Sequence, residues 1–166
     1  MKKFVIWRHA KSSWDHAFRS DHERSLANRG LSDTPEMATR LLKKGIKPDL
    51  MVSSDAVRAL DTARLAASIF QYPKEKIMAL ASMYHAGTKG LLHAIHQTEN
   101  RHEIVFFFGH NPGMTDLVNH FGEELDNLPT CGQFGFQSSA GAWNEISPEN
   151  TRFWFYDFPK SKLPDI

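Results

Sequence analysis

Three short apolar runs with little polar alternation stand out along the chain. They occupy residues 4–7 (FVIW), 50–54 (LMVSS) and 104–109 (IVFFFG). Runs of this length, rich in β-branched and aromatic residues, are typical of strands that are covered on both faces. The pattern therefore predicts that these segments form the centre of a mostly parallel sheet.

Amphipathic stretches with helical spacing follow the apolar runs. Residues 34–44 begin with Thr-Pro-Glu and end with two lysines before a glycine, which are start and stop signals of a helix. Apolar residues recur at helical intervals through 56–70 and 112–121. Asn111 followed by Pro112 matches an N-cap and a first helical position. We expect these helices to pack on the sheet.

The rest of the chain has weaker patterns. Residues 77–80, 133–137 and 151–158 favour further strands, the last two antiparallel or at an edge, and residues 88–97 favour a short helix. No internal repeat, low-complexity tract or flexible linker interrupts the chain. The alternation of strands and helices predicts an α/β fold in which residues 1–166 form one three-layer α/β/α domain.

Composition and charge narrow the classes of function. The chain has 166 residues, of which 41% are hydrophobic and 23% charged, as expected for a domain that buries a core. Its formal net charge of +1 gives no global field that would attract nucleic acid or an anionic membrane, so we expect neither as a partner. No apolar run is long enough for a signal peptide or a membrane span. Cys131 is the single cysteine and cannot form an internal disulfide, so we expect a cytoplasmic protein.

Four basic side chains fall where the predicted strands end. Arg8 and His9 directly follow the first apolar run, and His110 follows the third. Arg58 lies in the first turn of the helix after the second run. In open α/β sheets, ligands bind beyond the carboxyl ends of the strands, where helix N-termini offer free N–H groups to an anion. Because guanidinium groups bind phosphoryl oxygens in bidentate fashion and stay charged, this set predicts a site for a phosphoryl group.

The histidines add chemistry to this binding site. An imidazole beside two fixed cations resists protonation, so we expect a lowered pKa and a neutral, nucleophilic His9 near pH 7. His9 would then attack phosphorus and form a phosphohistidine that water later hydrolyses. Arg8, Arg58 and His110 would hold the negative charge of the phosphoryl oxygens.

Several segments resemble the histidine phosphatase superfamily, whose fold is phosphoglycerate mutase-like. WRHAKSSWD (residues 7–15) resembles the Arg-His-Gly signature of this superfamily, while SSDAVRALDTA (53–63) and GHNPG (109–113) resemble its segments with the second arginine and the second histidine. RHAKSSW, RSLANRG, MYHA, GHNPGM and LPT are most similar to the SixA-like phosphohistidine phosphatase branch. The resemblance extends from Lys3 to about Pro159.

This resemblance implies a three-layer α/β/α fold and hydrolysis of phosphate monoesters or phosphoramidates through a nucleophilic His9. It implies no metal and no other cofactor. Ser12, a position shared with the mutase form of the signature, is identified as substrate-binding. His93 and His96 share a helix face at a spacing that some metal sites use, but the lack of a third ligand favours a solvated surface.

Three departures from the superfamily pattern affect the expected chemistry. Ala10 replaces the glycine of the signature. Asp15 stands where mutase-like members carry a phosphate-contacting asparagine, so it turns away from the substrate, holds a proton or acts as a proton donor. Many members carry a glutamate general acid three or four residues before the tyrosine of the MYHA-like segment. Here Leu80 and Ala81 occupy those places.

The missing acid favours a substrate with a good leaving group. An alkoxide needs a proton as its bond to phosphorus breaks, whereas a phosphoimidazole protonated on its distal nitrogen leaves as neutral imidazole. We therefore hypothesise hydrolysis of phosphohistidine in proteins or of another activated phosphate compound. Phosphorylated proteins and small phosphorylated molecules are the expected partners, and the sequence implies no particular oligomeric state. Asp15, Asp21 and Glu23 are the candidates for a late proton donor.

Alternative functions fit the residues less well. A noncatalytic module that only binds phosphorylated ligands would also lack the acid, but it would gain little from a nucleophile at His9. A mutase is disfavoured by the short chain and the missing acid. Cys131 is not followed by an arginine at the end of a short phosphate-binding loop, which disfavours a cysteine-nucleophile phosphatase, and no glycine-rich nucleotide loop is present.

Overall fold

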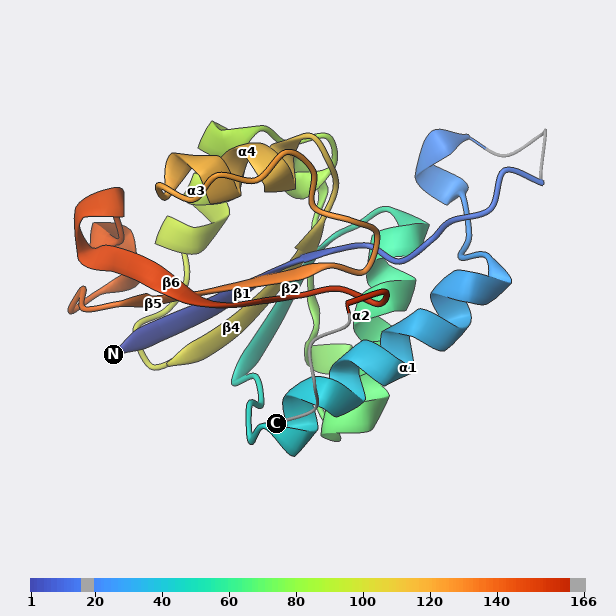
Figure 1. Ribbon diagram of the computed structural model, residues 1–166, viewed down its shortest axis with the longest axis horizontal. Helices are drawn as coiled ribbons and strands as arrows, with labels where there is room; N and C mark the ends of the chain where they lie inside the picture. The colour runs from blue at the N-terminus through green and yellow to red at the C-terminus, as the bar shows by residue number, and fades with distance from the viewer. Residues whose placement is uncertain (16–19, 162–166) are drawn as a thin grey trace.

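A sheet with helices on both faces forms the centre of the molecule (Figure 1). The computed structural model describes residues 1–15 and 20–161. Within those residues, six strands lie in the order β3-β2-β4-β1-β5-β6. Their bounds are β1 Lys2–Arg8, β2 Leu50–Ser54, β3 Met78–Leu80, β4 Ile104–Gly109, β5 Gln133–Ser138 and β6 Thr151–Asp157. The α-helices are α1 Asn28–Lys43, α2 Val57–Phe70, α3 Thr88–His96 and α4 Gly113–His120, and 3₁₀ helices lie at Asp21–Glu23, Lys74–Lys76, Ala81–Met83, Trp143–Glu145 and Pro148–Asn150.

The sheet is mostly parallel, which confirms the prediction from the apolar runs. β4 pairs parallel with β1 and β2, and β2 pairs parallel with β3. β5 pairs antiparallel with β1 and β6. In the β1–β4 pair, Arg8 lies opposite Gly109. The next residue after each strand is a histidine, so His9 and His110 leave the sheet side by side at its carboxyl edge.

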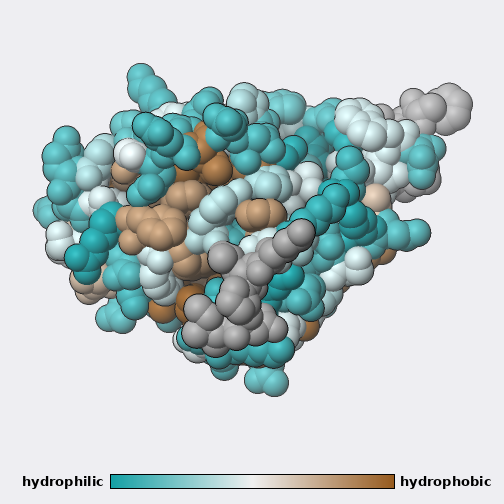
Figure 2. Space-filling view, in the orientation of Figure 1, coloured by the Kyte–Doolittle hydropathy of each residue, from teal (hydrophilic) through white to brown (hydrophobic). Residues whose placement is uncertain are grey.

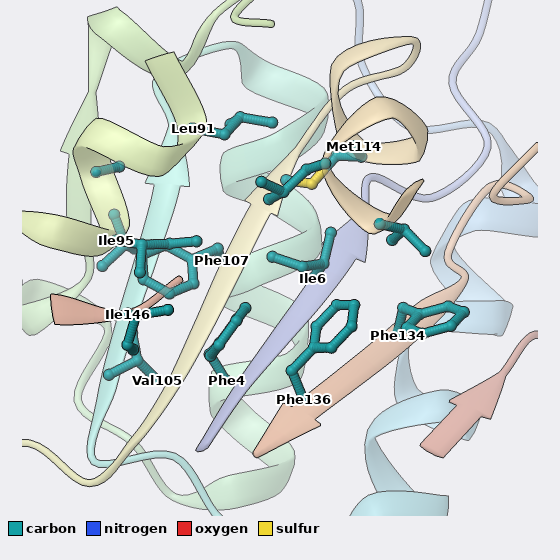
Figure 3. Close-up of a cluster of buried hydrophobic side chains, with 14 of the residues drawn as sticks. Phe4, Ile6, Leu91, Ile95, Val105, Phe107, Met114, Phe134, Phe136 and Ile146 are labelled. Carbon is teal, nitrogen blue, oxygen red and sulfur yellow. The ribbon is translucent and has the colours of Figure 1, made fainter. Parts of the chain in front are cut away.

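Two apolar cores, one on each face of the sheet, hold the layers together. Helices α3 and α4 cover one face, and α1 and α2 cover the other (Figure 1). Strand β1 contributes Phe4 and Ile6 to the first core and Val5 and Trp7 to the second, since successive side chains of a strand point to opposite faces. Figure 3 shows the first core, where side chains from β1, β4 and β5 meet those of α3 and α4. The three-layer α/β/α prediction is therefore confirmed.

One edge of the sheet is open to solvent. Figure 2 shows apolar atoms gathered over β6 and between it and helices α3 and α4. In β6, the side chain of Phe153 remains 48% exposed. The edge placement predicted for residues 151–158 is thus confirmed.

The start predicted for the first helix is wrong. Helix α1 begins at Asn28 rather than at Thr34, so Pro35 lies inside it. Proline lacks the N–H that would bond one turn back, which is why it is typical of a first turn. The Thr34 hydroxyl instead donates to the Gly30 carbonyl over 2.8 Å, within the part of the helix that the prediction omitted.

A tertiary contact accounts for the earlier start. The Ala27 amide donates to the carbonyl oxygen of Lys11 over 2.9 Å, just before α1 begins. Gly30 packs against the same oxygen so closely that an added Cβ atom would lie 2.3 Å from it. The first turn of α1 is thereby fixed against the loop that follows His9. Such a contact between distant segments leaves no periodic signal in the sequence.

The other elements match their predictions to within two residues at each end. Helix α4 begins at Gly113, and its N-cap position is taken by Pro112 rather than by Asn111 as predicted. The Asn111 side chain still binds this helix, because its oxygen accepts from the amide (3.2 Å) and the hydroxyl (2.9 Å) of Thr115. Asn111 therefore binds the first turn of α4 as expected of a capping residue, but it lies one residue before the N-cap position.

Two properties of the helices bear on function. Among the helices of the described residues, none is long and apolar enough to cross a membrane. In α3, His93 is exposed as predicted, whereas His96 is half-buried and its Nε2 lies 2.8 Å from the carbonyl oxygen of Ile146. The solvated surface predicted for His96 is therefore wrong, because the 3₁₀ helix Trp143–Glu145 and the residue after it pack beside α3.

We expect Gly30→Ala to destabilise the protein, although alanine is the better helix former. The new Cβ atom would meet the Lys11 carbonyl, and overpacking of this kind costs about 1–3 kcal/mol. Urea denaturation would measure the free energy of unfolding. Gly141→Ala is the matched control, because a Cβ there would meet only the Glu145 carboxylate at 3.9 Å. Equal stability of the two variants would contradict the contact.

Candidate active site

The basic residues predicted at the strand ends converge on one cavity. Arg8 ends β1, His9 follows it, His110 follows β4, and Arg58 is the second residue of α2. Together they line a cavity of about 240 Å³. The ring centroids of His9 and His110 lie 5.2 Å apart. Side chains that are distant along the chain thus meet at the carboxyl edge of the sheet.

The buried ring of His9 is held in one tautomer. Its Nδ1 lies 2.7 Å from the carbonyl oxygen of Ala10. Because a carbonyl can only accept, Nδ1 carries the hydrogen and Nε2 keeps its lone pair. The Ala10 amide in turn donates to the Thr62 hydroxyl over 3.0 Å, which fixes the backbone beside the ring. The Nε–H of Arg58 donates to this lone pair over 3.4 Å.

His110 presents one bonded and one unpaired nitrogen. Its Nε2 lies 2.8 Å from the Ser54 hydroxyl, which also accepts from the Ala56 amide over 3.2 Å. Among the described residues, Nε2 is the one acceptor within reach of the Ser54 hydroxyl hydrogen, so the hydroxyl donates to Nε2 and the hydrogen of the ring lies on Nδ1. This Nδ1 is buried and has no hydrogen-bond partner among the described residues. A buried donor without a partner is costly, so its presence beside a cavity is typical of a ligand site.

Both imidazoles are neutral at physiological pH. Burial lowers the pKa of His9 to about 3 against the opposing hydrogen bond to the Ala10 carbonyl, and neighbouring positive charges add to the shift. Burial also lowers the pKa of His110 to about 3, aided chiefly by the charge of Arg58. The pKa of His9 is lowered, as the sequence predicted. The largest cause of this shift is burial, however, rather than the charge of the two arginines.

Arg8 keeps part of its guanidinium unpaired. Its Nη1 donates to the Leu128 carbonyl over 3.0 Å, while its Nε is buried without a partner among the described residues. Burial and the charge of Arg58 lower the pKa of Arg8, although an arginine stays charged at any physiological pH. Arg8 therefore brings a permanent positive charge to the cavity.

Asp21 holds Arg58 from the side away from His9. The Nη1 of Arg58 donates to the Asp21 carbonyl oxygen over 2.6 Å, and its Nη2 donates to the carboxylate over 3.1 Å. These bonds leave Nε directed at His9. Asp21 does not itself line the cavity. The arrangement orients a guanidinium without placing a negative charge among the residues that face the cavity.

The Asp21 carboxylate is ionised. The Tyr84 hydroxyl donates to it over 2.5 Å and, together with Arg24 and Arg58, holds the pKa of this carboxyl well below its usual range. Asp21 therefore has no proton to give at neutral pH. Of the other two acids considered as late donors, Glu23 binds the Ser20 hydroxyl and Asp15 is exposed, and neither lines the cavity.

Arg24 is a cavity residue that the sequence reasoning did not single out. Its Nη2 donates to the Ser12 hydroxyl over 2.5 Å, its Nη1 to the Asp21 carboxylate over 3.1 Å, and its Nε to the Ser13 carbonyl over 3.2 Å. The guanidinium also lies over the ring of Trp14, 3.3 Å from the ring centroid. Ser12 lines the cavity as predicted for a substrate-binding residue. Arg24 is the first residue of the RSLANRG segment, and the resemblance of that segment to the SixA-like branch was the one indication in the sequence that Arg24 belongs to the site.

The departures from the superfamily signature have structural counterparts. Ala10 is fully buried, and its methyl group belongs to the core under α1 and α2. Leu80 packs against the opposite core, and no carboxylate lines the cavity among the described residues. Cys131 is buried and burial raises the pKa of its thiol to about 11, so it is no thiolate nucleophile. Among the described residues, the polar groups that line this cavity are thus imidazole, guanidinium and hydroxyl groups, with the amine of Lys11 and the carboxamide of Asn111.

A family model of the histidine phosphatase superfamily (branch 1) matches residues 4–128. The chain belongs to the histidine phosphatase superfamily. The match contains Arg8, His9, Arg58 and His110, and the protein is accordingly a phosphatase of the histidine-nucleophile type.

Relatives of this histidine phosphatase agree with its fold. An uncharacterised chloroplast protein of Arabidopsis thaliana is 27% identical over 152 residues, a match that covers 87% of this chain and 70% of the plant protein. The structure of a candidate phosphohistidine phosphatase SixA from Agrobacterium tumefaciens is 26% identical, with a TM-score of 0.77 over 93% of this chain and 96% of the other. A SixA structure with bound tungstate is 19% identical, with a TM-score of 0.79 over 95% and 97% of the two chains. These similarities confirm the phosphoglycerate mutase-like fold.

We expect Asp21→Asn to lower kcat of this histidine phosphatase about 10- to 100-fold, because Arg58 would lose the anion that orients it. KM should not rise, since the change removes a negative charge near an anionic substrate. Steady-state kinetics with p-nitrophenyl phosphate would measure both constants. Glu23→Gln is the matched control and should retain full activity. A loss confined to alkyl phosphates would instead identify Asp21 as a proton donor.

The ring resonances of His9 and His110 should not titrate between pH 8 and pH 5. A folded-state pKa of about 3 keeps both imidazoles neutral throughout this range, whereas an ordinary histidine is half protonated near pH 6.5. Carbon-detected or proton–carbon NMR of the free protein would follow the rings, with the protein unfolded in urea as the reference. A midpoint near 6.5 for either ring in the folded protein would show that the cavity does not exclude its proton.

Proposed function

We propose that His9 is the nucleophile of this phosphatase and that it attacks the phosphorus of an activated phosphoryl donor. The observation that carries this proposal is the fixed tautomer of His9, whose Nδ1–H donates to the Ala10 carbonyl while the lone pair of Nε2 accepts a long bond from Arg58 Nε. We propose that this arginine donor turns to a phosphoryl oxygen when the donor substrate binds, which frees the lone pair for attack. A neutral imidazole held in this way needs no general base before it attacks. The Ala10 carbonyl also stabilises the positive charge that the ring acquires once Nε2 is phosphorylated.

The proposed reaction has two steps. In the first, a bond forms between Nε2 and phosphorus as the bond to the leaving group breaks, and the leaving atom keeps the bonding pair. In the second, water attacks phosphorus, the pair of the P–Nε2 bond returns to His9, and one water proton passes to solvent. The free enzyme and inorganic phosphate result.

Three groups are assigned to the phosphoryl oxygens. Arg8 offers a buried Nε and His110 a buried Nδ1, and neither has a partner among the described residues. Arg58 offers the Nε that faces His9. Preorganised donors of this kind stabilise the charge that spreads over the oxygens during phosphoryl transfer, and removal of one typically costs about 100-fold or more in rate.

Ser12 is assigned to substrate binding. Its oxygen accepts from Arg24, so its own hydrogen is free to donate to a phosphoryl oxygen. Because Arg24 also contacts Asp21, the position of Ser12 is linked to that of Arg58.

The leaving group sets the substrate class, and we assign phosphohistidine in proteins, or another activated phosphate compound, as the substrate. The cavity has no carboxylate among its described lining residues that could protonate an alkoxide. A phosphoimidazole with a proton on its distal nitrogen leaves as neutral imidazole and requires no such acid. The SixA structures named above, one of them a protein histidine phosphatase, support the same class.

We expect kcat/KM for a histidine-phosphorylated protein to exceed that for alkyl phosphates by about 100-fold or more, which is the contribution of a carboxylic general acid that alkyl leaving groups need and that is absent from the described lining of this cavity. A screen of phosphohistidine protein, sugar phosphates and nucleotides would measure the ranking. His9→Ala should abolish turnover of every donor.

The covalent intermediate provides an independent control. Brief reaction with a ³²P-labelled donor should leave an acid-labile, base-stable label on the protein, and His9→Ala should carry none. Equal turnover of alkyl and activated donors would contradict the substrate class. Tight phosphate binding without turnover or label would favour the noncatalytic phosphate-binding module.

A further inference from the structure

Trp14 is placed unusually for a large aromatic side chain. It lines the mouth of the cavity that contains His9 and Arg58, yet 73% of its surface is exposed. Among the described residues it is the most exposed large apolar side chain. A single exposed apolar residue is common on protein surfaces and carries no argument by itself. Trp14 differs from such residues because it lines the cavity that contains His9 and Arg58, where a substrate would contact it.

The Trp14 ring is held in place despite its exposure. The Arg24 guanidinium covers one of its faces, 3.3 Å from the ring centroid. Arg24 is itself held by hydrogen bonds to Ser12, Ser13 and Asp21. The arginine therefore fixes the position of the indole, and not the reverse. Cation–π contacts with arginine are a common way to orient an aromatic ring. The exposed remainder of the indole is therefore a rigid, flat apolar surface at the cavity mouth.

The chemistry of the cavity decides what this surface can contact. Arg8, His9 and Arg58 lie inside the cavity and are assigned to the phosphoryl group, so the leaving group of a bound donor has to extend toward the mouth. A planar leaving group that extends to the mouth can stack on the indole, whereas an amino group offers no ring to stack. Stacked aromatic pairs contribute a modest but measurable free energy, and they do so for any planar ring.

We propose that Trp14 determines specificity by stacking on the planar ring of the leaving group, which is the imidazole of phosphohistidine in a protein substrate. This inference rests on the proposed function, since it requires that His9 take the phosphoryl group from such a donor. Trp14 touches neither phosphorus nor the nucleophile in this assignment. It orients the bond that breaks, and Arg24 orients Trp14.

Two donors with the same P–N bond test the proposal. N-phosphohistidine in a peptide carries the ring, and phosphoramidate carries only an amino group, while their leaving groups, imidazole and ammonia, are both neutral. Trp14→Ala should lower kcat/KM for the phosphohistidine peptide about 10-fold and leave that for phosphoramidate within about 2-fold. Trp14→Phe, which keeps a flat ring, should recover most of the loss. Circular dichroism of each variant would verify the fold.

The outcomes separate the two proposals. An equal loss with both donors in Trp14→Ala would show that Trp14 only supports Arg24, and no loss with either donor would show that the ring has no role. Either result overturns the assignment of Trp14 and leaves the proposed function intact. Failure of the unaltered protein to turn over either donor, or to label His9, would contradict the proposed function itself.

Discussion

The site depends on how positive charge is held beside an uncharged imidazole. Arg8, Arg58 and two histidines share one small cavity, and a carboxylate within it would satisfy the guanidinium groups and exclude a phosphoryl anion. The structure meets this constraint by placing Asp21 outside the cavity, where it bonds the far side of Arg58. The arginine is oriented and the interior keeps its positive potential. Burial then favours the neutral form of both rings.

The backbone enforces this arrangement before any side chain contributes. The parallel register that pairs Arg8 with Gly109 delivers His9 and His110 to neighbouring positions, so their separation follows from strand spacing. Ser54, the last residue of β2, then bonds the second ring. Three adjacent strands thus end in residues of the same site. The sheet provides the precision that a reaction between fixed groups requires, because strands move less than loops.

The sequence predicted the parts of the site that are tied to regular elements. His9, His110 and Arg58 could be found because apolar runs locate strand ends, and parallel strands bring their ends together. Arg24 was not predicted, and Asp21 was considered only as a late proton donor, because both lie between β1 and α1, where position follows from contacts and not from periodicity. The start of α1 was wrong for the same reason, since the approach of Gly30 to the Lys11 carbonyl is visible only in three dimensions.

A single group of polar contacts links binding, orientation and recognition. Arg24 bonds Ser12 and Asp21 and covers Trp14, and Asp21 bonds Arg58, which faces His9. A shift of Arg24 on binding would therefore change the position of Trp14 at the cavity mouth and, through Asp21 and Arg58, the surroundings of His9. Asp21 stays ionised in this network, because Tyr84, Arg24 and Arg58 donate hydrogen bonds that stabilise its negative charge. This carboxylate is thereby committed to positioning Arg58, and in the proposed reaction the leaving imidazole already carries the proton that it needs.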